Sequence, residues 1–495
     1  MGHQLTLPPS RLFIDGGWRE ASGDERDDVI NPATEAVLAT VGRATVADTD
    51  RALSAARRAF DQGPWGRFDG AERARHLRRF HSALAERAAA ISALVVAEVG
   101  TTVAATRGHQ VGLPIEHLAY WADLAERPEL VPYPPRVTAR SDGTSWLGGW
   151  VVRREPVGVV AAITAYNFPF LLNIMKLGPA LAAGNTVVLK PSPYTPLSAL
   201  VLAEAAAAAD LPPGVLNVVT GGPDVGAALT TDPRVDLVSF TGSDAIGAAI
   251  MGQAAPSLKR LVLELGGKSP LVIRHDADLD LAAQLGVQSF TFHAGQGCAL
   301  TTRHLVHQSL VTPYQEKVAA IVDRLRVGDP ADPDTHVGPL IRPVAVERTE
   351  RYVAEAVRAG ATVVTGGRRP EELSKGFFYQ PTLLGHVDNR WPVAQEEIFG
   401  PVAVVVAFED DDHAVALAND SAYGLDGHVV SADAGAAFAL ACRLRTGGVS
   451  LNGGAGWTNP AVPFGGYKRS GFGRENGEAG LDEYTQLKTI KYHAT

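Results

Sequence analysis

Short apolar runs alternate with helix-forming segments through the middle of the chain. Strand-like runs rich in Val, Leu and Ile lie at 156–164, 186–192, 214–221, 235–243 and 261–267. Helical segments separate them, near 168–183, at 196–210, and starting at Asp224 and Asp244. Fully apolar strands alternating with helices indicate βαβ units. The pattern therefore predicts a doubly wound parallel sheet, with its ligand at the carboxyl ends of the strands.

A second alternation begins after residue 267. The pattern predicts helices at about 277–292, 312–326 and 344–359, and strands at about 303–307, 361–367 and 401–409. A chain of 495 residues is too long for one ordinary core. We therefore expect a second α/β domain.

Two segments rich in β-forming residues fall outside these alternations. Residues 137–154 are strand-like on either side of Asp142-Gly143, a hairpin signal, and residues 483–493 form a strand-like tail. Both could add strands to another subunit, or they could pair with each other within one subunit. Their spacing leaves both arrangements open.

Charge and apolar patterning exclude some functions. The net charge is −9, and the one basic cluster, at 73–81, has Leu77 and Phe80 at helical spacing, which predicts an amphipathic surface helix and no nucleic-acid partner. The longest apolar region, 157–189, is interrupted by Asn167 and Lys176, so no membrane span is expected. No signal peptide is visible, and we expect a cytoplasmic protein.

The chain has two cysteines, too few for a disulfide framework or a zinc site, and no metal is expected. Cys442, in the apolar segment AFALACRLR, is interpreted as a small core residue. Cys298 lies in HAGQGCAL, where glycines leave the thiol approachable. Such a thiol is a candidate nucleophile.

Three other short segments suit chemistry together with Cys298. The strand-to-helix turn FTGSDAIG (240–247) offers backbone N–H groups for phosphate, although it is not a G-x-G-x-x-G motif. Glu264 within the apolar strand VLELGGKSP could be a general base or a structural ion-pair partner. Asn167 in TAYNFPF could stabilise an oxyanion or cap a turn. In combination they fit oxidation of an aldehyde through a thioester.

An ordered set of motifs resembles the aldehyde dehydrogenase superfamily from about residue 12 onward: NFPF, GNTVVLKPS, FTGS, LELGGKSP, GQGC, EEIFGPV and PFGGYKRSGFGRE. The resemblance implies an α/β fold with a Rossmann-like parallel-sheet cofactor domain, a second α/β catalytic domain and a small β-arm oligomerisation domain. The implied boundaries are 1–134 with 155–263 for the cofactor domain, 264–445 for the catalytic domain with 446–481 returning along the interface, and 135–154 with 482–495 for the arms. It further implies an aldehyde substrate, NAD with NADP possible, a homodimer or homotetramer, and intersubunit pairing of the arms.

The resemblance also implies roles for individual residues. Cys298 matches the nucleophile, Glu264 the general base and Asn167 the oxyanion donor, while Lys176 and Glu475 match a proton path. The implied cofactor-binding residues are Ile163, Thr164, Ala165, Tyr166, Asn167, Lys190, Ser192, Pro193, Gly222, Gly226, Phe240, Thr241, Gly242, Ser243, Gly247, Glu264, Leu265, Gly266, Glu397 and Phe399. The implied substrate residues are Phe168, Leu172, Met175, Phe292, Trp457 and Phe464. This substrate set contains no Arg or Lys, which favours a neutral aliphatic or aromatic aldehyde.

The sequence departs from the family pattern at three places. Tyr166 stands where Trp is common, and no second cysteine flanks Cys298. Pro193 stands where many members have Glu, whose carboxylate binds the adenosine ribose and repels a 2′-phosphate. We therefore expect weaker discrimination against NADP.

Three other functions are alternatives. A CoA-acylating relative would pass the thioester to coenzyme A, but such members generally lack the glutamate at the position of Glu264. A Cys-His thiol hydrolase could use His293 as its base, but this explains neither the dinucleotide-type sheet nor EEIFGPV. A non-catalytic member would not be expected to retain Cys298 and Asn167.

Overall fold

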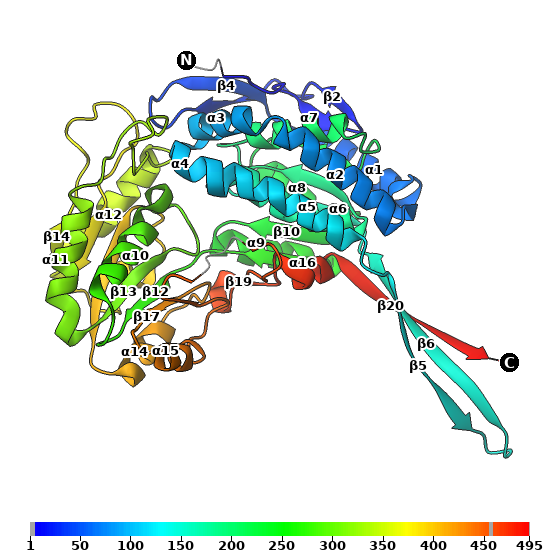
Figure 1. The fold of residues 1–495 in the computed structure, drawn as a ribbon. Helices are drawn as coiled ribbons and strands as arrows, with labels where there is room; N and C mark the ends of the chain where they lie inside the picture. The colour runs from blue at the N-terminus through cyan, green and yellow to red at the C-terminus, as the bar shows by residue number, and fades with distance from the viewer. Residues whose placement is uncertain (1–4, 455–458, 495) are drawn as a thin grey trace.

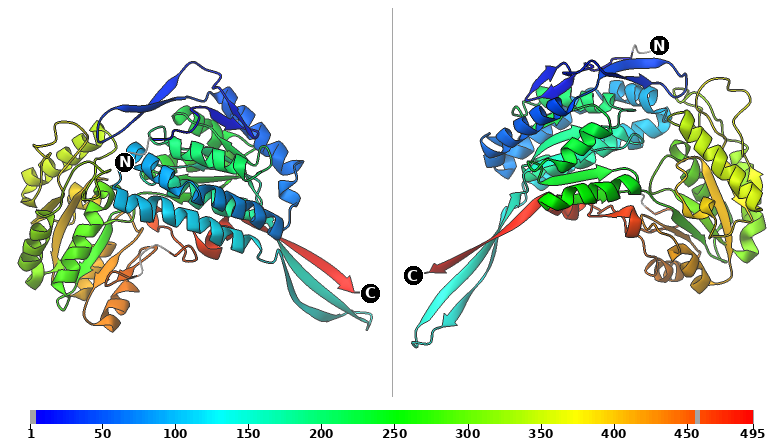
Figure 2. Two further views of the ribbon diagram at one scale, coloured as in Figure 1. Left: turned by 45° about the horizontal axis from the view of Figure 1, so that its top comes forward. Right: turned by 180° about the vertical axis from the view of Figure 1, so that it is seen from behind.

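The computed structural model describes residues 5–454 and 459–494. Two α/β lobes lie side by side, and a long β arm extends away from one of them (Figures 1 and 2). The predicted α/β class with two parallel-sheet lobes is confirmed. Within the described residues, no helix is long and apolar enough to cross a bilayer.

The first lobe contains an eight-stranded sheet. Its central five strands are parallel and include every strand predicted between residues 156 and 267. The chain winds from β7 outward in both directions, so the doubly wound prediction is confirmed. Across the sheet the strands are β19 (Gly471–Phe472), β11 (Arg260–Glu264), β10 (Leu237–Thr241), β7 (Val159–Ile163), β8 (Thr186–Lys190), β9 (Leu216–Val218), β1 (Leu12–Ile14) and β2 (Gly17–Arg19).

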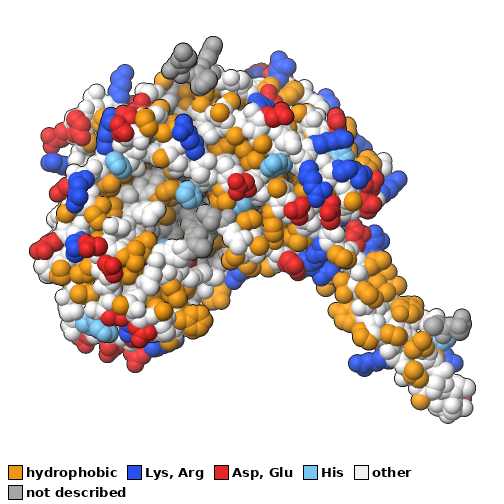
Figure 3. Space-filling model, in the orientation of Figure 1, with side chains coloured by type: hydrophobic (Ala, Val, Ile, Leu, Met, Phe, Trp, Pro, Cys, Tyr) orange, Lys and Arg blue, Asp and Glu red, His pale blue; other side chains and the backbone are white. Residues whose placement is uncertain are grey.

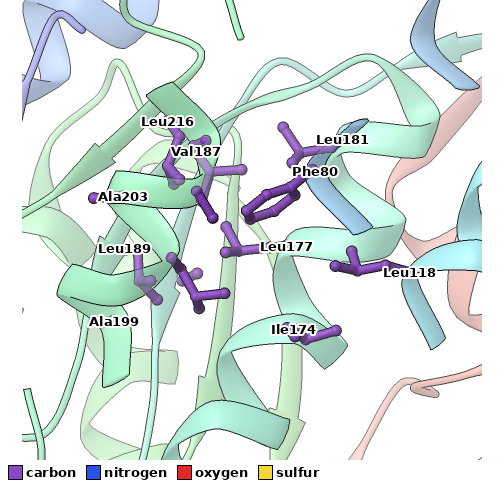
Figure 4. Packing of buried hydrophobic residues seen from close by; sticks show 14 of the residues in the cluster. Phe80, Leu118, Ile174, Leu177, Leu181, Val187, Leu189, Ala199, Ala203 and Leu216 are labelled. Carbon is purple, nitrogen blue, oxygen red and sulfur yellow. The ribbon is translucent and has the colours of Figure 1, made fainter. Parts of the chain in front are cut away.

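Helices cover both faces of this sheet (Figure 1). They are α1 (Val46–Asp61), α2 (Gly70–Ala85), α3 (Ala88–Val99), α5 (Leu113–Ala125), α6 (Pro169–Ala183), α7 (Leu197–Ala208), α8 (Pro223–Thr231), α9 (Asp244–Ala254) and α16 (Gly477–Glu483). In one core, Leu177 of α6 lies near Phe80 of α2 and Val187 of β8 (Figure 4). Leu77 and Phe80 are fully buried, which confirms the amphipathic helix predicted from the basic cluster.

Helices α5 and α6 approach each other closely. A Cβ atom on Gly178 of α6 would lie 2.2 Å from Cδ1 of Trp121 on α5. A larger residue at Gly178 would therefore push the two helices apart. Every residue of α6 is buried, including Lys176. This contact fixes α5 against the helix that carries Met175 and Lys176.

The second lobe contains a seven-stranded sheet and includes the predicted strands and helices beyond residue 267. Its strands, in order, are β14 (Thr362–Thr365), β15 (Thr382–Gly385), β16 (Val402–Phe408), β13 (Thr301–His307), β12 (Ser269–Ile273), β17 (His428–Val430) and β18 (Ser450–Leu451). Its main helices are α10 (Leu279–Thr291), α11 (Val311–Val322), α12 (Pro343–Ala359), α14 (Asp411–Asn419) and α15 (Ala434–Ala441). The sequence did not indicate β12, β15, β17 or β18, which have between two and five residues each.

The interpretation of Cys442 as a core residue is wrong, because its side chain is exposed. Helix α15 lies on the surface and buries one narrow face, which includes Ala437 and Leu440. Cys442 follows the last turn and lies off that face, as does Phe438, which is 64% exposed. An apolar composition alone did not indicate which side of this short helix is covered.

The arm is a three-stranded antiparallel sheet of β5 (Leu130–Ala139), β6 (Ser145–Pro156) and β20 (Thr485–Ala494). The predicted hairpin is present, and Asp142 accepts hydrogen bonds from Thr144 at its tip. The tail pairs with β6 of its own chain, from Thr485 opposite Pro156 to Ala494 opposite Leu147. The prediction that the tail pairs with another subunit is therefore wrong. Helix α16 ends at Glu483, and Thr485 already lies opposite Pro156. The end of the helix therefore places the tail directly beside the edge of β6.

A separate hairpin, β3 (Arg26–Ile30) and β4 (Val37–Gly42), lies at the top of the molecule in Figure 1.

Candidate active site

A cavity of about 390 Å³ lies at the carboxyl ends of the first sheet. Segments that follow β7, β10 and β11 form one side of it, and the segment between α10 and β13 closes another. In parallel sheets these strand ends are where ligands bind. From the predicted set the lining includes Ala165, Tyr166, Asn167, Phe168, Leu172, Met175, Thr241, Gly242, Ser243, Leu265, Gly266, Cys298, Glu397, Phe399 and Phe464.

The Cys298 thiol lines this cavity and is partly exposed. The chain reaches it through His293 and Ala294, both with positive φ angles. A Cβ atom on Gly267 would lie 2.2 Å from the carbonyl oxygen of Cys298, so glycine there permits the close approach of the two segments. Burial raises the pKa of the Cys298 thiol above its usual range, and the carboxylates of Glu397 and Glu264 raise it further.

Asn167 lies beside the same cavity with a buried side chain. Its Nδ2 donates to the carbonyl oxygen of Gln296 at 2.9 Å, which joins it to the cysteine loop. The backbone carbonyl oxygen of Asn167 accepts a hydrogen bond from Gln110 Nε2 at 2.9 Å. Because an amide nitrogen carries two hydrogens, Asn167 retains one donor for another acceptor.

Glu264 is 2% exposed and, although it does not line the cavity surface, its charge acts on Cys298. Neither carboxyl oxygen has a hydrogen-bond partner among the described residues. Burial raises the pKa of Glu264 well above its usual range, Glu475 raises it further, and Lys176 opposes both. Lys176 and Glu475 form a buried ion pair of 2.7 Å behind the cavity. A carboxyl with a raised pKa accepts a proton more readily than an exposed one.

Glu397 and Phe399 come from the second lobe to line the cavity. Glu397 accepts from the backbone N–H of Gly267 at 3.0 Å, and burial raises its pKa to about 7. Phe399 has a φ of 55°, uncommon for a non-glycine residue, and its ring meets that of Tyr166 edge-on, with centroids 5.8 Å apart. Arg348 donates to the Phe399 carbonyl at 3.3 Å and also lines the cavity.

Other residues of the predicted cofactor set lie outside this cavity. Burial lowers the pKa of Lys190 to about 8, and its ammonium group donates to the Pro191 carbonyl at 3.1 Å. Gly247 packs against Leu265, while Ser243, which does line the cavity, caps α9 by accepting from Ile246 N–H. The remaining predicted residues off the cavity are Ile163, Thr164, Ser192, Pro193, Gly222, Gly226 and Phe240.

One wall of the cavity is formed by apolar side chains. Phe168, Leu171, Leu172 and Met175 form a buried cluster, against which Phe292 and Phe464 pack. The sequence had indicated most of this wall, but not Leu113, His117, Leu171 or Asn476, which also line the cavity. Trp457 lies outside the described residues. Leu171 lies on α6 beside Leu172, whereas Leu113, His117 and Asn476 carry no motif and reach the cavity only because α5 and α16 pack beside α6.

His293 is buried, does not line the cavity with Cys298, and meets the ring of Phe168 edge-on at 5.3 Å. Burial lowers its pKa to about 4. This arrangement gives no support to a Cys-His hydrolase.

An approachable thiol, an amide donor and a desolvated carboxyl, placed between a dinucleotide-type sheet edge and an apolar wall, define an oxidoreductase-type thiol site. Comparison of the chain with known proteins supports this class. The family model described as "Aldehyde dehydrogenase family" matches residues 18–490, and the chain belongs to the aldehyde dehydrogenase family.

Individual relatives match nearly end to end. Aminoaldehyde dehydrogenase 2, peroxisomal, from Pisum sativum is 38% identical over 98% of this chain and 96% of its own. Geranial dehydrogenase from Castellaniella defragrans is 39% identical over 98% and 99%. The crystal structure of betaine aldehyde dehydrogenase from Staphylococcus aureus in complex with NAD+ superposes with a TM-score of 0.94 at 36% identity, covering 98% of this chain and 94% of that one.

Proposed function

We propose that this enzyme oxidises a neutral aliphatic or aromatic aldehyde to a carboxylic acid, using NAD+ and water. The observation that carries the proposal is the shared cavity of Cys298 and Asn167, with an apolar wall on one side and Glu397 on the other. Membership of the family supports aldehyde oxidation. The assay is absorbance of reduced cofactor together with identification of the acid product. Absence of both with a broad aldehyde panel would refute it.

Cys298 acts as the nucleophile. Its thiol, which is partly exposed, gives its proton to solvent water, and the thiolate sulfur bonds to the aldehyde carbon to give a thiohemiacetal oxyanion. The Asn167 amide and the Cys298 backbone N–H stabilise that oxyanion, and one such donor contributes roughly 3–4 kcal/mol. NAD+, when bound, supplies the hydride acceptor, and loss of hydride from the adduct leaves a thioester on Cys298.

Glu264 then activates water. It takes a proton from the water, the oxygen attacks the thioester carbon, and the carbon–sulfur bond breaks to release the acid and the Cys298 thiolate. The raised pKa of Glu264 suits this role, because the carboxyl is a stronger base than an exposed one. Lys176 and Glu475 form the proton path that returns Glu264 to its ionised form.

This assignment disfavours the CoA-acylating alternative, which does not need an activated water. Assays with and without coenzyme A separate the two. Faster turnover with coenzyme A and an acyl-CoA product would favour the alternative.

The residues present fit NAD. We propose that Glu397 binds the nicotinamide ribose, Phe399 and Tyr166 lie by the ring, and Lys190 and Pro193 lie near the adenosine ribose. The N-terminus of α9, with Ser243 as its cap, is a suitable site for the pyrophosphate. Ile163, Thr164, Ala165, Asn167, Ser192, Gly222, Gly226, Phe240, Thr241, Gly242, Gly247, Glu264, Leu265 and Gly266 complete the proposed set. The relative crystallised with NAD+ supports this choice.

The neutral substrate follows from the chemistry of the apolar wall. Among the described residues, the wall formed by Phe168, Leu172, Met175, Phe464 and their neighbours has no charged side chain to bind an ionic substrate. Phe292 and Trp457 complete the proposed substrate set. The relative named for geranial supports an apolar aldehyde, whereas others are named for aminoaldehydes. Relative kcat/KM for apolar and amino-substituted aldehydes tests the proposal, which a preference for the cationic ones would contradict.

We also propose a homodimer or homotetramer assembled through the arm. Apolar side chains are exposed along it, among them Leu130, Tyr133, Val137 and Leu487 (Figure 3). An exposed apolar strand favours association. A Val137→Lys substitution should give smaller species on light scattering, whereas an unchanged mass would contradict this. From membership of the family we propose a division into a cofactor domain (1–134 and 155–263), a catalytic domain (264–445 with 446–481) and the arms (135–154 and 482–495). We also propose a cytoplasmic location, which cell fractionation would test.

A further inference from the structure

Two polar side chains interrupt the apolar part of the cavity. His117, on α5, is 1% exposed, and Asn476, just before α16, is 4% exposed. Both line the cavity that contains Cys298. Among the described residues, the two ring nitrogens of His117 have no hydrogen-bond partner. The same is true of Oδ1 of Asn476.

Such groups are costly to leave unpaired. A buried polar atom without a partner destabilises the fold by an amount comparable to a lost hydrogen bond, so most buried groups are satisfied. His117 is held in place, since Trp121, one turn later on α5, packs against Gly178 of α6. This contact fixes the backbone of α5 at His117, whose ring is buried from solvent.

We propose that His117 and Asn476 form a specificity site for an uncharged oxygen substituent of the substrate, such as a hydroxyl group, remote from the aldehyde carbon. The inference rests on the proposed function and narrows its substrate class to hydroxy-substituted apolar aldehydes. A neutral imidazole has one donor and one acceptor, and an amide oxygen accepts. A hydroxyl group, both donor and acceptor, matches this pair.

The charge of the site supports a neutral substituent. Burial lowers the pKa of His117 to about 4, so the ring is uncharged near neutral pH. An ammonium substituent would need a carboxylate, and among the described cavity residues the carboxylates are Asp244 and Glu397, which follow β10 and precede β16. A carboxylate substituent would need a cation, which His117 does not supply; the cation among the described cavity residues is Arg348, which donates to the Phe399 carbonyl.

The experiment compares hydroxy-substituted and unsubstituted aldehydes of equal length, as kcat/KM, in the parent and in His117→Phe. Because a site built to bind a hydroxyl rejects the analogue that lacks it, the parent should favour the hydroxy aldehyde by roughly tenfold or more. His117→Phe keeps the ring and removes both polar atoms, so it should abolish the preference, chiefly by lowering kcat/KM for the hydroxy aldehyde. Asn476→Leu should reduce it.

The matched control is His81→Phe, a half-buried histidine of α2 outside the cavity, which should leave the preference unchanged. If the parent oxidises both aldehydes equally, or if His117→Phe keeps the preference, the inference is wrong while the proposed function stands. If the parent oxidises neither these nor simple aldehydes, the proposed function itself fails. Should His117→Phe fold poorly on thermal melting, His117→Gln, which retains a donor and an acceptor, must keep the preference.

Discussion

The ammonium nitrogen of Lys176 lies 2.7 Å from Oε1 of Glu475, and both side chains are buried. Lys176 also donates to the Ser239 hydroxyl at 3.2 Å, which in turn accepts from Tyr484 at 2.9 Å. The two members of the ion pair act on Glu264 in opposite senses, since Glu475 raises the pKa of Glu264 and Lys176 lowers it. The protonation state of Glu264 therefore depends on this pair.

The first prediction uses these opposite effects. Lys176→Gln should move the acid limb of the kcat–pH profile to higher pH, because a cation that favours ionised Glu264 is lost. Glu475→Gln should move it to lower pH, because a like charge is lost. The two profiles should therefore move in opposite directions from that of the parent. Movement of both profiles in the same direction would contradict the electrostatic account, and thermal melts would verify that each variant is folded.

The second prediction concerns the two cysteines. Cys298→Ala should abolish aldehyde oxidation, because the covalent intermediate cannot form. Cys442→Ala, at an exposed position outside the cavity, is the matched control and should leave the rate nearly unchanged. Steady-state production of reduced cofactor measures both. Comparable losses in the two variants would remove Cys298 from its assigned role.

The third prediction separates acylation from hydrolysis. Glu264→Gln should still form the thioester but hydrolyse it slowly, because the amide cannot take a proton from water. Intact mass spectrometry after mixing with aldehyde and NAD+ should show an acyl adduct, and rapid mixing should show one burst of reduced cofactor. A variant that shows neither adduct nor burst would place Glu264 in an earlier step.

The fourth prediction is thermodynamic. The raised pKa of Glu264 means that ionising its carboxyl destabilises the folded state. This loss of stability is absent at pH values below the pKa of Glu264 in the unfolded chain, and it is complete at pH values above its pKa in the folded protein. Glu264→Gln should therefore raise the Tm of this 495-residue chain at alkaline pH, by about 1 °C for each kcal/mol recovered, and have little effect near pH 4. Differential scanning calorimetry across pH measures this. An equal effect at all pH values would show that the charge is not the cause.

The fifth prediction concerns the cofactor. Pro193 can neither accept a hydrogen bond from a ribose hydroxyl nor repel a 2′-phosphate, so discrimination against NADP should be weak. Pro193→Glu should sharpen the NAD preference by about tenfold, because a charge-assisted hydrogen bond is worth roughly 1.5–3 kcal/mol. The measurement is kcat/KM for NAD and NADP in both proteins. A parent that already rejects NADP as strongly as the variant would show that this position does not set selectivity.

Local pattern was enough for much of the fold. The five parallel strands of the first lobe and the helices between them follow directly from apolar runs and their spacing, because parallel strands covered on both faces must be apolar along their length. The short strands β17 and β18 escaped notice because two or three residues carry no readable period. The arm hairpin was predictable from Asp142-Gly143, whereas the partner of the tail was not.

By itself, the sequence determined the family through its motifs, and it indicated the candidate residues for chemistry, Cys298 in its glycine-rich loop and Glu264 within an apolar strand. Only the tertiary structure decided which neighbours surround them. It brought His117 and Asn476, which are 359 positions apart in the chain, to the cavity of Cys298, and it left Cys442 in solvent. The physical reason is that periodicity records how much of an element is covered, while the identity of what covers it depends on contacts between distant segments.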